Sequence, residues 1–311
     1  RQHGIHLLGP NTLGFQRPQL KLNASVAGAM ANPGPLALVS QSGALTSSIL
    51  DWAQRNGVGF STVISLGPNT SVDLPQALDF LANDGATQSI LVYMEGIRNA
   101  RRFMSALRAA AYAKPVVVMK AGRKPAGSRA ALTHSAAIVG SDDVFEAALR
   151  RAGAVRVRLV NQLFSAAKCL ASRYRPVGKR LAIVTNGGGP GVLAADWASE
   201  IGLTVASLAE GLRDDLAARL PTGTQLQSVI DLGEDALPAH YAAALVACGK
   251  DPAIDGLLAI YSPKPDNDPA AVAQGVTEVF RLTGKPVLAC WMGDERVKPA
   301  REVLNAAAVP N

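Results

Sequence analysis

Short apolar runs alternate along the chain with segments in which apolar residues recur at helical spacing. Leu181-Ala182-Ile183-Val184 is one such run, and Leu193, Trp197 and Ile201 then recur every fourth residue. A short continuous apolar run is typical of a strand buried on both faces, and the four-residue spacing predicts a helix. Between them stands Thr185-Asn186-Gly187-Gly188-Gly189-Pro190-Gly191, so the pattern indicates a strand, a tight glycine turn and a helix.

The same unit occurs earlier in the chain. Leu36 to Val58 aligns without gaps on Leu181 to Leu203, with identity at eight positions where chance would supply about two. Lys114-Pro115 and Lys285-Pro286 each precede a further apolar run. The identical pairs are Leu36/Leu181, Ala37/Ala182, Val39/Val184, Gly43/Gly188, Asp51/Asp196, Trp52/Trp197, Ala53/Ala198 and Gly57/Gly202. Two repeats are too few for a solenoid, so we interpret them as a duplicated domain.

Strands and helices alternate through both units, which predicts the α/β class with two similar doubly wound parallel-sheet domains. We expect a connecting arm over residues 1–33, because turn formers are dense there, and domains over residues 34–176 and 177–311. Residues 121–140 interrupt the alternation and are rich in glycine, serine and alanine, so we expect a long loop there.

Composition narrows the classes of function. The net charge of +7 is carried by scattered arginine and lysine residues without aromatic clusters, which argues against nucleic-acid binding and favours anionic small-molecule substrates. The three cysteines lack paired spacing, which indicates a reducing cytoplasm, and no stretch reaches the length of a membrane span. The four histidines have no zinc-site spacing, so no metal centre is expected.

The two glycine turns are the first candidate sites. Each turn opens a helix, and the backbone N–H groups at a helix N-terminus bind phosphate or carboxylate without a basic side chain. One such turn alone is equally compatible with a purely structural role, but its repetition favours anion binding. The candidate phosphate-binding residues are Ser42, Gly43, Asn186, Gly187, Gly188, Gly189 and Gly191.

His134 and Glu95 are the candidate catalytic residues. His134 lies in the expected loop among small residues, and a neutral imidazole with a pKa near 6.5 is nucleophilic. Glu95 follows an apolar strand, so its carboxylate would lie at the sheet edge where ligands gather and would orient one ring nitrogen of His134. An exposed loop histidine and a charge at a helix start are the structural alternatives.

Several motifs together resemble the NDP-forming acyl-CoA synthetases, including the α subunit of succinyl-CoA synthetase. Thr133 to Gly140 resembles their phosphohistidine loop, with Ala136 in place of the usual glycine, and Met94-Glu95-Gly96 resembles the strand end that supports that histidine. The other matching stretches are Ser40 to Thr46, Thr185 to Gly191, Val229 to Leu232 without the usual Asn-Pro, and Gly9 to Gly14 with Thr12 in place of cysteine. The amino-acid sequences of Ala147 to Gly191 and Pro286 to Pro310 are also similar to those of bacterial proteins in which this core is fused to a GNAT-type lysine acetyltransferase.

The resemblance implies two flavodoxin-like domains and the reaction acyl-CoA + phosphate + NDP ⇌ acid + CoA + NTP, through an acyl phosphate and a phosphohistidine. It implies CoA or acyl-CoA, phosphate, and ATP or ADP with Mg as ligands, with CoA and nucleotide bound mainly by a CoA-binding domain and an ATP-grasp domain outside this chain. A homo-oligomer is also implied. Two alternatives stay open: an acyl-CoA-sensing regulatory region of an acetyltransferase, and a flavodoxin-like scaffold without phosphate affinity.

Overall fold

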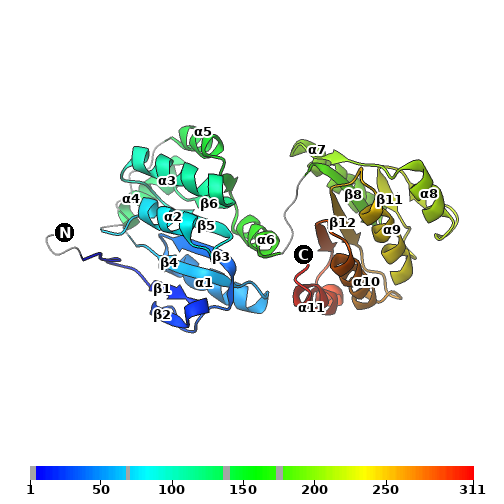
Figure 1. Cartoon of the computed structure of the whole chain (residues 1–311), viewed down its shortest axis with the longest axis horizontal. Coiled ribbons are helices and arrows are strands. Elements are labelled where there is room, and N and C mark those ends of the chain that lie inside the picture. Colours follow the sequence, from blue (N-terminus) through cyan, green and yellow to red (C-terminus); the bar gives the residue numbers. More distant parts are fainter. Residues whose placement is uncertain (1–4, 68–70, 136–140, 173–177) are drawn as a thin grey trace. The chain divides into compact units, whose positions relative to one another are not determined.

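The computed structural model describes residues 5–67, 71–135, 141–172 and 178–311, and for residues 132–135 it describes the backbone alone. The chain divides into two compact units, Arg1–Ala171 and Ser172–Asn311. Each unit has its own sheet and its own helices, labelled in Figure 1.

The first unit is built on parallel strands that are buried on both faces. Their order is β4-β3-β5-β6-β7, the 2-1-3-4-5 order of flavodoxin-like folds. Helices α1 and α6 cover one face with one apolar cluster, and helices α2, α3 and α5 cover the other. The strands are β3 (Pro33–Ser40), β4 (Phe60–Ser65), β5 (Ser89–Met94), β6 (Val116–Lys120) and β7 (Val155–Val157), and the helices are α1 (Gly43–Arg55), α2 (Leu74–Asn83), α3 (Ala100–Ala113), α4 (Pro125–Ser135), α5 (Asp142–Ala152) and α6 (Val160–Ala171).

Part of the segment that the sequence presents as an arm belongs to this sheet. Strands β1 (Gly14–Arg17) and β2 (Leu22–Ser25) form an antiparallel hairpin around the short helix η1 (Pro18–Leu20), and β1 pairs antiparallel with β4. Gly14 has a φ of +94°, and a Cβ there would lie 2.1 Å from the carbonyl oxygen of Ala24, so only glycine fits.

The expected loop over residues 121–140 is wrong for its middle part, because Pro125–Ser135 forms helix α4. Two features explain the helix. Proline is favoured at the first helical position, and Ala126, Ala130 and Ala131 have the highest helix propensity of any residue type. The Ser128 hydroxyl also donates to the carbonyl oxygen of Gly122, 2.9 Å away, just before the helix.

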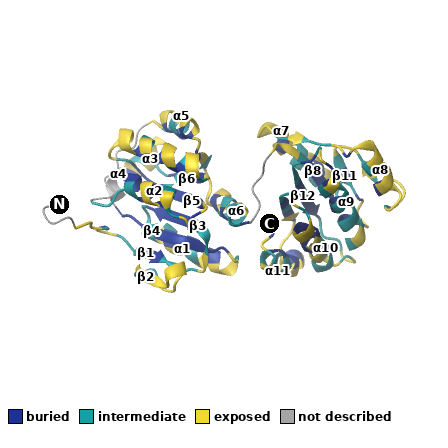
Figure 2. Ribbon diagram, viewed as in Figure 1, coloured by how far each residue is buried: buried dark blue, intermediate teal, exposed yellow. Residues whose placement is uncertain are grey.

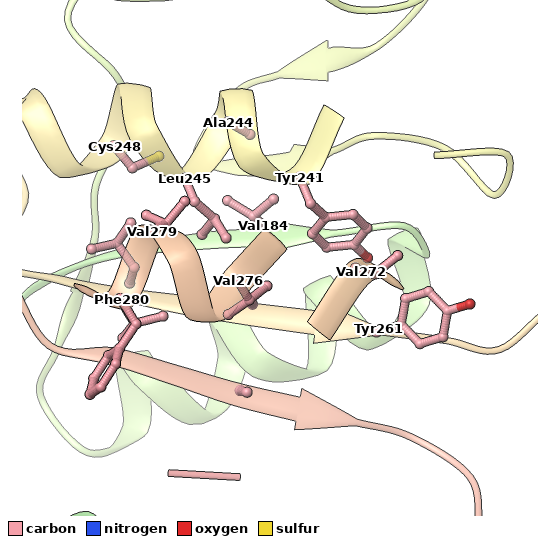
Figure 3. Close-up of a cluster of buried hydrophobic side chains, with 14 of the residues drawn as sticks. Val184, Tyr241, Ala244, Leu245, Cys248, Tyr261, Val272, Val276, Val279 and Phe280 are labelled. Atoms are coloured by element: carbon pink, nitrogen blue, oxygen red, sulfur yellow. The ribbon is translucent and has the colours of Figure 1, made fainter. Parts of the chain in front are cut away.

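The second unit repeats the plan in shorter form. Its sheet has the order β10-β11-β8-β12-β13, with β9 beside the first residues of β8. Figure 3 shows the core on one face, where Tyr241, Leu245 and Cys248 of α9 meet Val184 of β8 and Val276 of α10. The strands are β8 (Arg180–Thr185), β9 (Thr204–Val205), β10 (Gln225–Leu226), β11 (Val229–Asp231), β12 (Gly256–Tyr261) and β13 (Val287–Trp291), and the helices are α7 (Gly188–Glu200), α8 (Glu210–Ala217), α9 (Pro238–Lys250), α10 (Pro269–Leu282), η2 (Glu295–Val297) and α11 (Lys298–Ala306).

The apolar stripe that predicts helix α7 is not its buried face. The helix is confirmed, but Leu193, Trp197 and Ile201 are 61%, 66% and 69% exposed, and α7 carries exposed positions along its length in Figure 2. The first unit differs here, because Trp52 of α1 stacks on Phe164 of α6 with ring centroids 4.3 Å apart. Trp52 and Trp197 are equivalent in the duplication, so the two units cover this helix differently.

The repeated Lys-Pro sequence has one structural role in both units. The Lys114 and Lys285 ammonium groups each donate to carbonyl oxygens at the C-terminal end of a preceding helix, where the helix dipole favours a cation. The duplication therefore extends from the first strand at least to this lysine. The acceptors are the carbonyl oxygens of Leu81 and Asp84 for Lys114, and those of Cys248 and Asp251 for Lys285.

Candidate functional site

The candidate residues of the first unit lie at the carboxyl edge of its sheet, at the point where the strand order reverses. From β3 the chain continues through α1 to β4 on one side, and β5 pairs with β3 on the other side. Adjacent loops that diverge in this way leave a crevice, which is where open α/β sheets bind ligands. Ser42 follows β3 and Glu95 follows β5, so both lie at this edge of the sheet.

The turn after β3 is shaped by its own hydroxyl groups. The Ser40 hydroxyl accepts from the N–H of Ser42 at 3.1 Å and donates to the carbonyl oxygen of Ser42 at 2.8 Å. The Ser42 side chain then caps α1 by accepting from the N–H of Leu45 at 3.3 Å. Since Ser42 satisfies a later N–H group, those of Gly43 and Ala44 at the start of the helix have no intrahelical acceptor.

Gln41 links this turn to Glu95. Its amide oxygen accepts from the N–H groups of Glu95 at 2.5 Å and Gly96 at 3.2 Å, and its amide nitrogen donates to the carbonyl oxygen of Gly96 at 3.0 Å. We call this set of three bonds the carboxamide clamp. It holds the backbone after β5 against the turn that opens α1.

The Glu95 side chain is buried, and one of its carboxylate oxygens is unsatisfied. The residue is 6% exposed, and within the described part of the chain its Oε2 has no hydrogen-bond partner. Burial, and then the nearby charge of Glu95, raise the pKa of the Tyr93 phenol. A buried carboxylate oxygen without a donor is costly, so this position favours a ligand or side chain that brings an N–H or O–H group.

His134 is described by its backbone, which lies in the last turn of α4. Its side chain, and residues 136–140 of the resembling motif, lie outside the described residues. The expected contact between His134 and Glu95 therefore stays a prediction.

The second unit repeats the first turn almost bond for bond. The Thr185 hydroxyl accepts from the N–H of Gly187 and donates to its carbonyl oxygen, both at 3.0 Å, as Ser40 does for Ser42. Asn186 forms a second carboxamide clamp, accepting from the N–H of Ser262 at 2.8 Å and donating to its carbonyl oxygen at 2.9 Å.

Ser262 stands in the second unit where Glu95 stands in the first. Leu36 pairs with Ser89 and the equivalent Leu181 pairs with Gly256, so residues six positions after each partner correspond. These residues are Glu95 and Ser262. The additional methylene of Gln41 relative to Asn186 explains why the first clamp reaches one residue further, to the carbonyl oxygen of Gly96.

The first turn of α7 is uncapped. Gly187 has no side chain to accept from the helix, and the next two N–H groups, at the exposed Gly188 and Gly189, have no intrahelical acceptor. The glycines differ in what a Cβ would meet: the Ser262 hydroxyl at 3.3 Å from Gly187, an Asp231 carboxylate oxygen at 3.0 Å from Gly188, no atom within 4 Å of Gly189, and Val229 at 2.8 Å from Gly191. Packing therefore explains Gly191, whereas among the described residues Gly189 has no neighbour in space, outside its adjacent residues in the chain, that requires glycine.

Features of other kinds of site are few in the part of the chain that the structure describes. Among the described residues, no group of three or more His, Cys, Asp or Glu side chains could hold a metal ion. Cys169, Cys248 and Cys290 are free thiols. None of the helices within the described ranges is long and apolar enough to span a membrane.

The candidate list from the sequence omitted Gln41, Ser40 and Ser262. The first two had a signal in the duplication, because Ser40-Gln41 aligns with Thr185-Asn186, a hydroxyl followed by a carboxamide in both units. Ser262 had none, since its equivalence to Glu95 depends on strand register.

Comparisons with known proteins agree with this architecture. Residues 33–170 match the succinyl-CoA ligase-like flavodoxin domain, and residues 181–311 match the ligase-CoA domain. The solved structure of dinucleotide-forming acetyl-coenzyme A synthetase 1 from Candidatus Korarchaeum cryptofilum, in complex with phosphate and ADP, matches with a TM-score of 0.94 at 30% identity over 99% of this chain and 68% of that one. These matches confirm an α/β fold with two flavodoxin-like parallel-sheet domains.

Sequence relatives identify the family. The chain is 36% identical over 310 residues to ADP-forming acetate–CoA ligase I of Archaeoglobus fulgidus, covering all of this chain but only 44% of that protein. It is 34% identical over 312 residues to the α subunit of ADP-forming acetate–CoA ligase I of Pyrococcus furiosus, covering 67% of that subunit. The chain belongs to the family of the ADP-forming acetate–CoA ligase α subunits.

Proposed function

We propose that this chain is the central part of an NDP-forming acyl-CoA synthetase of the acetate–CoA ligase type. The reaction is acyl-CoA + phosphate + NDP ⇌ acid + CoA + NTP. The observation that carries the proposal is the buried Glu95 carboxylate, which has an unpartnered oxygen at the switch point of a flavodoxin-like sheet. Membership of the ligase family supports the same conclusion.

In this proposal His134 is the nucleophile for an acyl phosphate. One imidazole nitrogen attacks phosphorus, the bond from phosphorus to the acyl oxygen breaks, and the carboxylate leaves. Glu95 accepts a hydrogen bond from the other ring nitrogen, which keeps the attacking nitrogen unprotonated and stabilises the positive charge that develops. The phosphohistidine then transfers its phosphoryl group to the nucleoside diphosphate.

The two glycine turns are the proposed phosphate-binding elements. Ser42 and Gly43 open α1, and the uncapped N–H groups of Gly188 and Gly189 open α7, so each offers the positive end of a helix dipole. Asn186, Gly187 and Gly191 shape the second turn.

We assign CoA and the nucleotide to domains or subunits other than this chain. CoA or acyl-CoA is bound by a CoA-binding domain or subunit, and ATP or ADP with Mg by an ATP-grasp domain or subunit. We also propose a cytoplasmic homo-oligomer, and acetate as the first acid to test, because the relatives are named as acetate–CoA ligases.

The test is phosphorylation of the purified 311-residue chain by acetyl phosphate, which bypasses CoA and nucleotide. Acid-labile phosphate on the chain is expected, and it should be absent from His134→Ala. Glu95→Gln should slow labelling by roughly 10²–10⁴-fold, the usual range for an acid–base partner. His6→Ala, an exposed histidine in the same unit, is the matched control and should label normally.

Equal labelling of wild type and His134→Ala would contradict the catalytic role. Binding of acetyl phosphate without any labelling would instead favour the acyl-CoA-sensing alternative. A fusion to a GNAT-type acetyltransferase is a separate proposal drawn from the resemblance, and the complete reading frame around this chain tests it. The relatives reported above are CoA ligases.

A further inference from the structure

The carboxamide clamp is a feature that the proposed chemistry does not use directly. Gln41 touches the backbone on both sides of the peptide bond between Glu95 and Gly96 through three hydrogen bonds. None of these bonds involves the Glu95 carboxylate, whose Oε2 is unpartnered within the described residues. The clamp therefore fixes the backbone of Glu95, and it leaves the carboxylate Oε2 available to another partner.

We propose that Gln41 is a positioning residue that holds the Glu95 carboxylate in place for the proposed phosphohistidine chemistry. This inference rests on the proposed function and adds to it a residue that acts through Glu95. Glu95 lies just beyond the last residue of β5, where the sheet no longer holds the backbone. Gln41 supplies the missing acceptor and donor there, in the way that the next residue of a strand would.

The second unit provides an independent example of the same device. Asn186 is 2% exposed and makes the equivalent bonds to the N–H and carbonyl groups of Ser262. Because Ser262 corresponds to Glu95, both units use a carboxamide from the turn to hold the residue that follows the strand. The clamp is present in both units although one holds a glutamate and the other a serine. Its common role is therefore to position the backbone of the residue after the strand.

The same comparison supplies a conservative variant. Asn186 shows that an asparagine at this turn reaches the N–H group of the residue directly after the strand. Gln41→Asn should therefore keep the bond to the Glu95 N–H group and lose the bonds to Gly96, whereas Gln41→Ala loses all three.

Hydrogen exchange on the purified chain tests the clamp without any catalysis. In Gln41→Ala, protection of the Glu95 and Gly96 amides should fall at least about tenfold, as expected for loss of a buried hydrogen bond. Leu91 and Val92, in the buried middle of β5, should keep their protection. Gln41→Asn should keep protection at Glu95 and lose it at Gly96. Unchanged protection at Glu95 in Gln41→Ala would overturn the inference.

Labelling by acetyl phosphate tests whether the clamp acts through Glu95. Gln41→Ala should lower the maximal rate by about 10–100-fold, because displacement of a catalytic group by about 1 Å costs on that order, with little change in the acetyl phosphate concentration at half-maximal rate. Gln41→Asn should recover most of the rate. Gln54→Ala, at an exposed glutamine of α1, the helix that follows the Gln41 turn, is the matched control and should behave as wild type.

The decisive measurement is the double variant. In a Glu95→Gln background, Gln41→Ala should lower the rate less than about twofold further, since residues that act as one unit are not additive. Rate losses that multiply would overturn the positioning role while leaving His134 phosphorylation standing. An unlabelled wild-type chain would overturn the proposed function, and hydrogen exchange would still report on the clamp.

Discussion

Substitutions at Gly191 and Gly189 separate the packing role of the glycine turn from its proposed role in phosphate binding. We predict that Gly191→Ala destabilises the second unit relative to Gly189→Ala. A Cβ at Gly191 would lie 2.8 Å from Val229 Cγ1 and 3.0 Å from Thr185 Cγ2, whereas a Cβ at Gly189 meets no atom within 4 Å. Both positions lie in α7, where alanine is favoured over glycine by up to about 1 kcal/mol. The gain is smaller at Gly189, because Pro190 follows it and its ring disfavours the helical region for a preceding residue with a Cβ.

The size of the difference follows from whether the neighbours can move. Thr185 cannot rotate without breaking the two hydrogen bonds between its hydroxyl and Gly187. Val229 lies in β11 and is β-branched, so its χ1 angle is restricted as well. Forcing an additional methyl group into such a contact costs about 1–3 kcal/mol, which is the expected gap between the two variants.

Urea unfolding measures this gap. In a Trp52→Phe background the remaining tryptophans, Trp197 and Trp291, both report on the second unit. Gly189→Ala should unfold close to that background, because its gain in helix propensity is offset by the restriction that Pro190 places on it, and Gly191→Ala should unfold at lower urea with an unchanged slope. Equal stability of the two alanine variants would refute the reasoning, since it would mean that the turn relaxes around Gly191 at no cost.

Three further predictions concern other contacts. Asn186→Ala should destabilise the second unit by about 1–3 kcal/mol in the same urea assay, because it leaves the N–H and carbonyl groups of Ser262 without their partner; a smaller loss would mean that water replaces the clamp. Hydrogen bonds from Arg180 hold the pKa of Asp255 below its usual 3.8, so the stability from this pair is present above that pH and lost on acidification below it. Unfolding at pH 7 and at about pH 2.5 should therefore differ less in Arg180→Met than in wild type, and an equal difference would contradict the assignment. The chain alone should form no acetyl-CoA from acetate, CoA, ATP and Mg, and product in a CoA-thioester assay would place the missing binding sites in this chain.

The sequence predicted the elements whose signal is local and strong. The runs beginning at Leu36 and Leu181 are buried strands, and the Lys-Pro sequences at Lys114 and Lys285 mark the same position in both units. Continuous apolar runs identify strands buried on both faces because no polar alternation is tolerated there.

Elements that depend on distant partners were missed. Strands β1 and β2 have four residues each. Strand β1 pairs with β4, which is distant in sequence, and β2 pairs with β1. Helix α4 is not expected from the sequence because its small residues are typical of a loop. Pro125, at the first helical position, is the local signal that favours the helix. The exposure of Trp197 does not follow from the α7 sequence either. The equivalent Trp52 is covered by Phe164 of α6, so exposure depends on a neighbouring helix and not on the helix that carries the tryptophan.

The candidate site divides in the same way. Glycine turns and the strand-end Glu95 follow from local sequence, and the structure brings Ser42 and Glu95 to the same edge of the sheet through the strand order. The roles of Gln41 and Ser262 required the register of β3 against β5 and of β8 against β12, which no local pattern contains.

Glu95 and Ser262 occupy equivalent positions, so the carboxyl edges of the two sheets differ in side-chain chemistry at this position. The scaffold, the hydroxyl that shapes the turn and the carboxamide clamp are common to both units. The residue that the clamp holds is a carboxylate in the first unit and a hydroxyl in the second. A carboxylate can orient an imidazole and stabilise its cation, but it repels a phosphate dianion, whereas a hydroxyl can donate to one. The proposed histidine chemistry is therefore matched to the first unit. In the second unit Ser262 can donate a hydrogen bond to an anion, whereas the Asp231 carboxylate beside Gly188 opposes a second negative charge at the same turn.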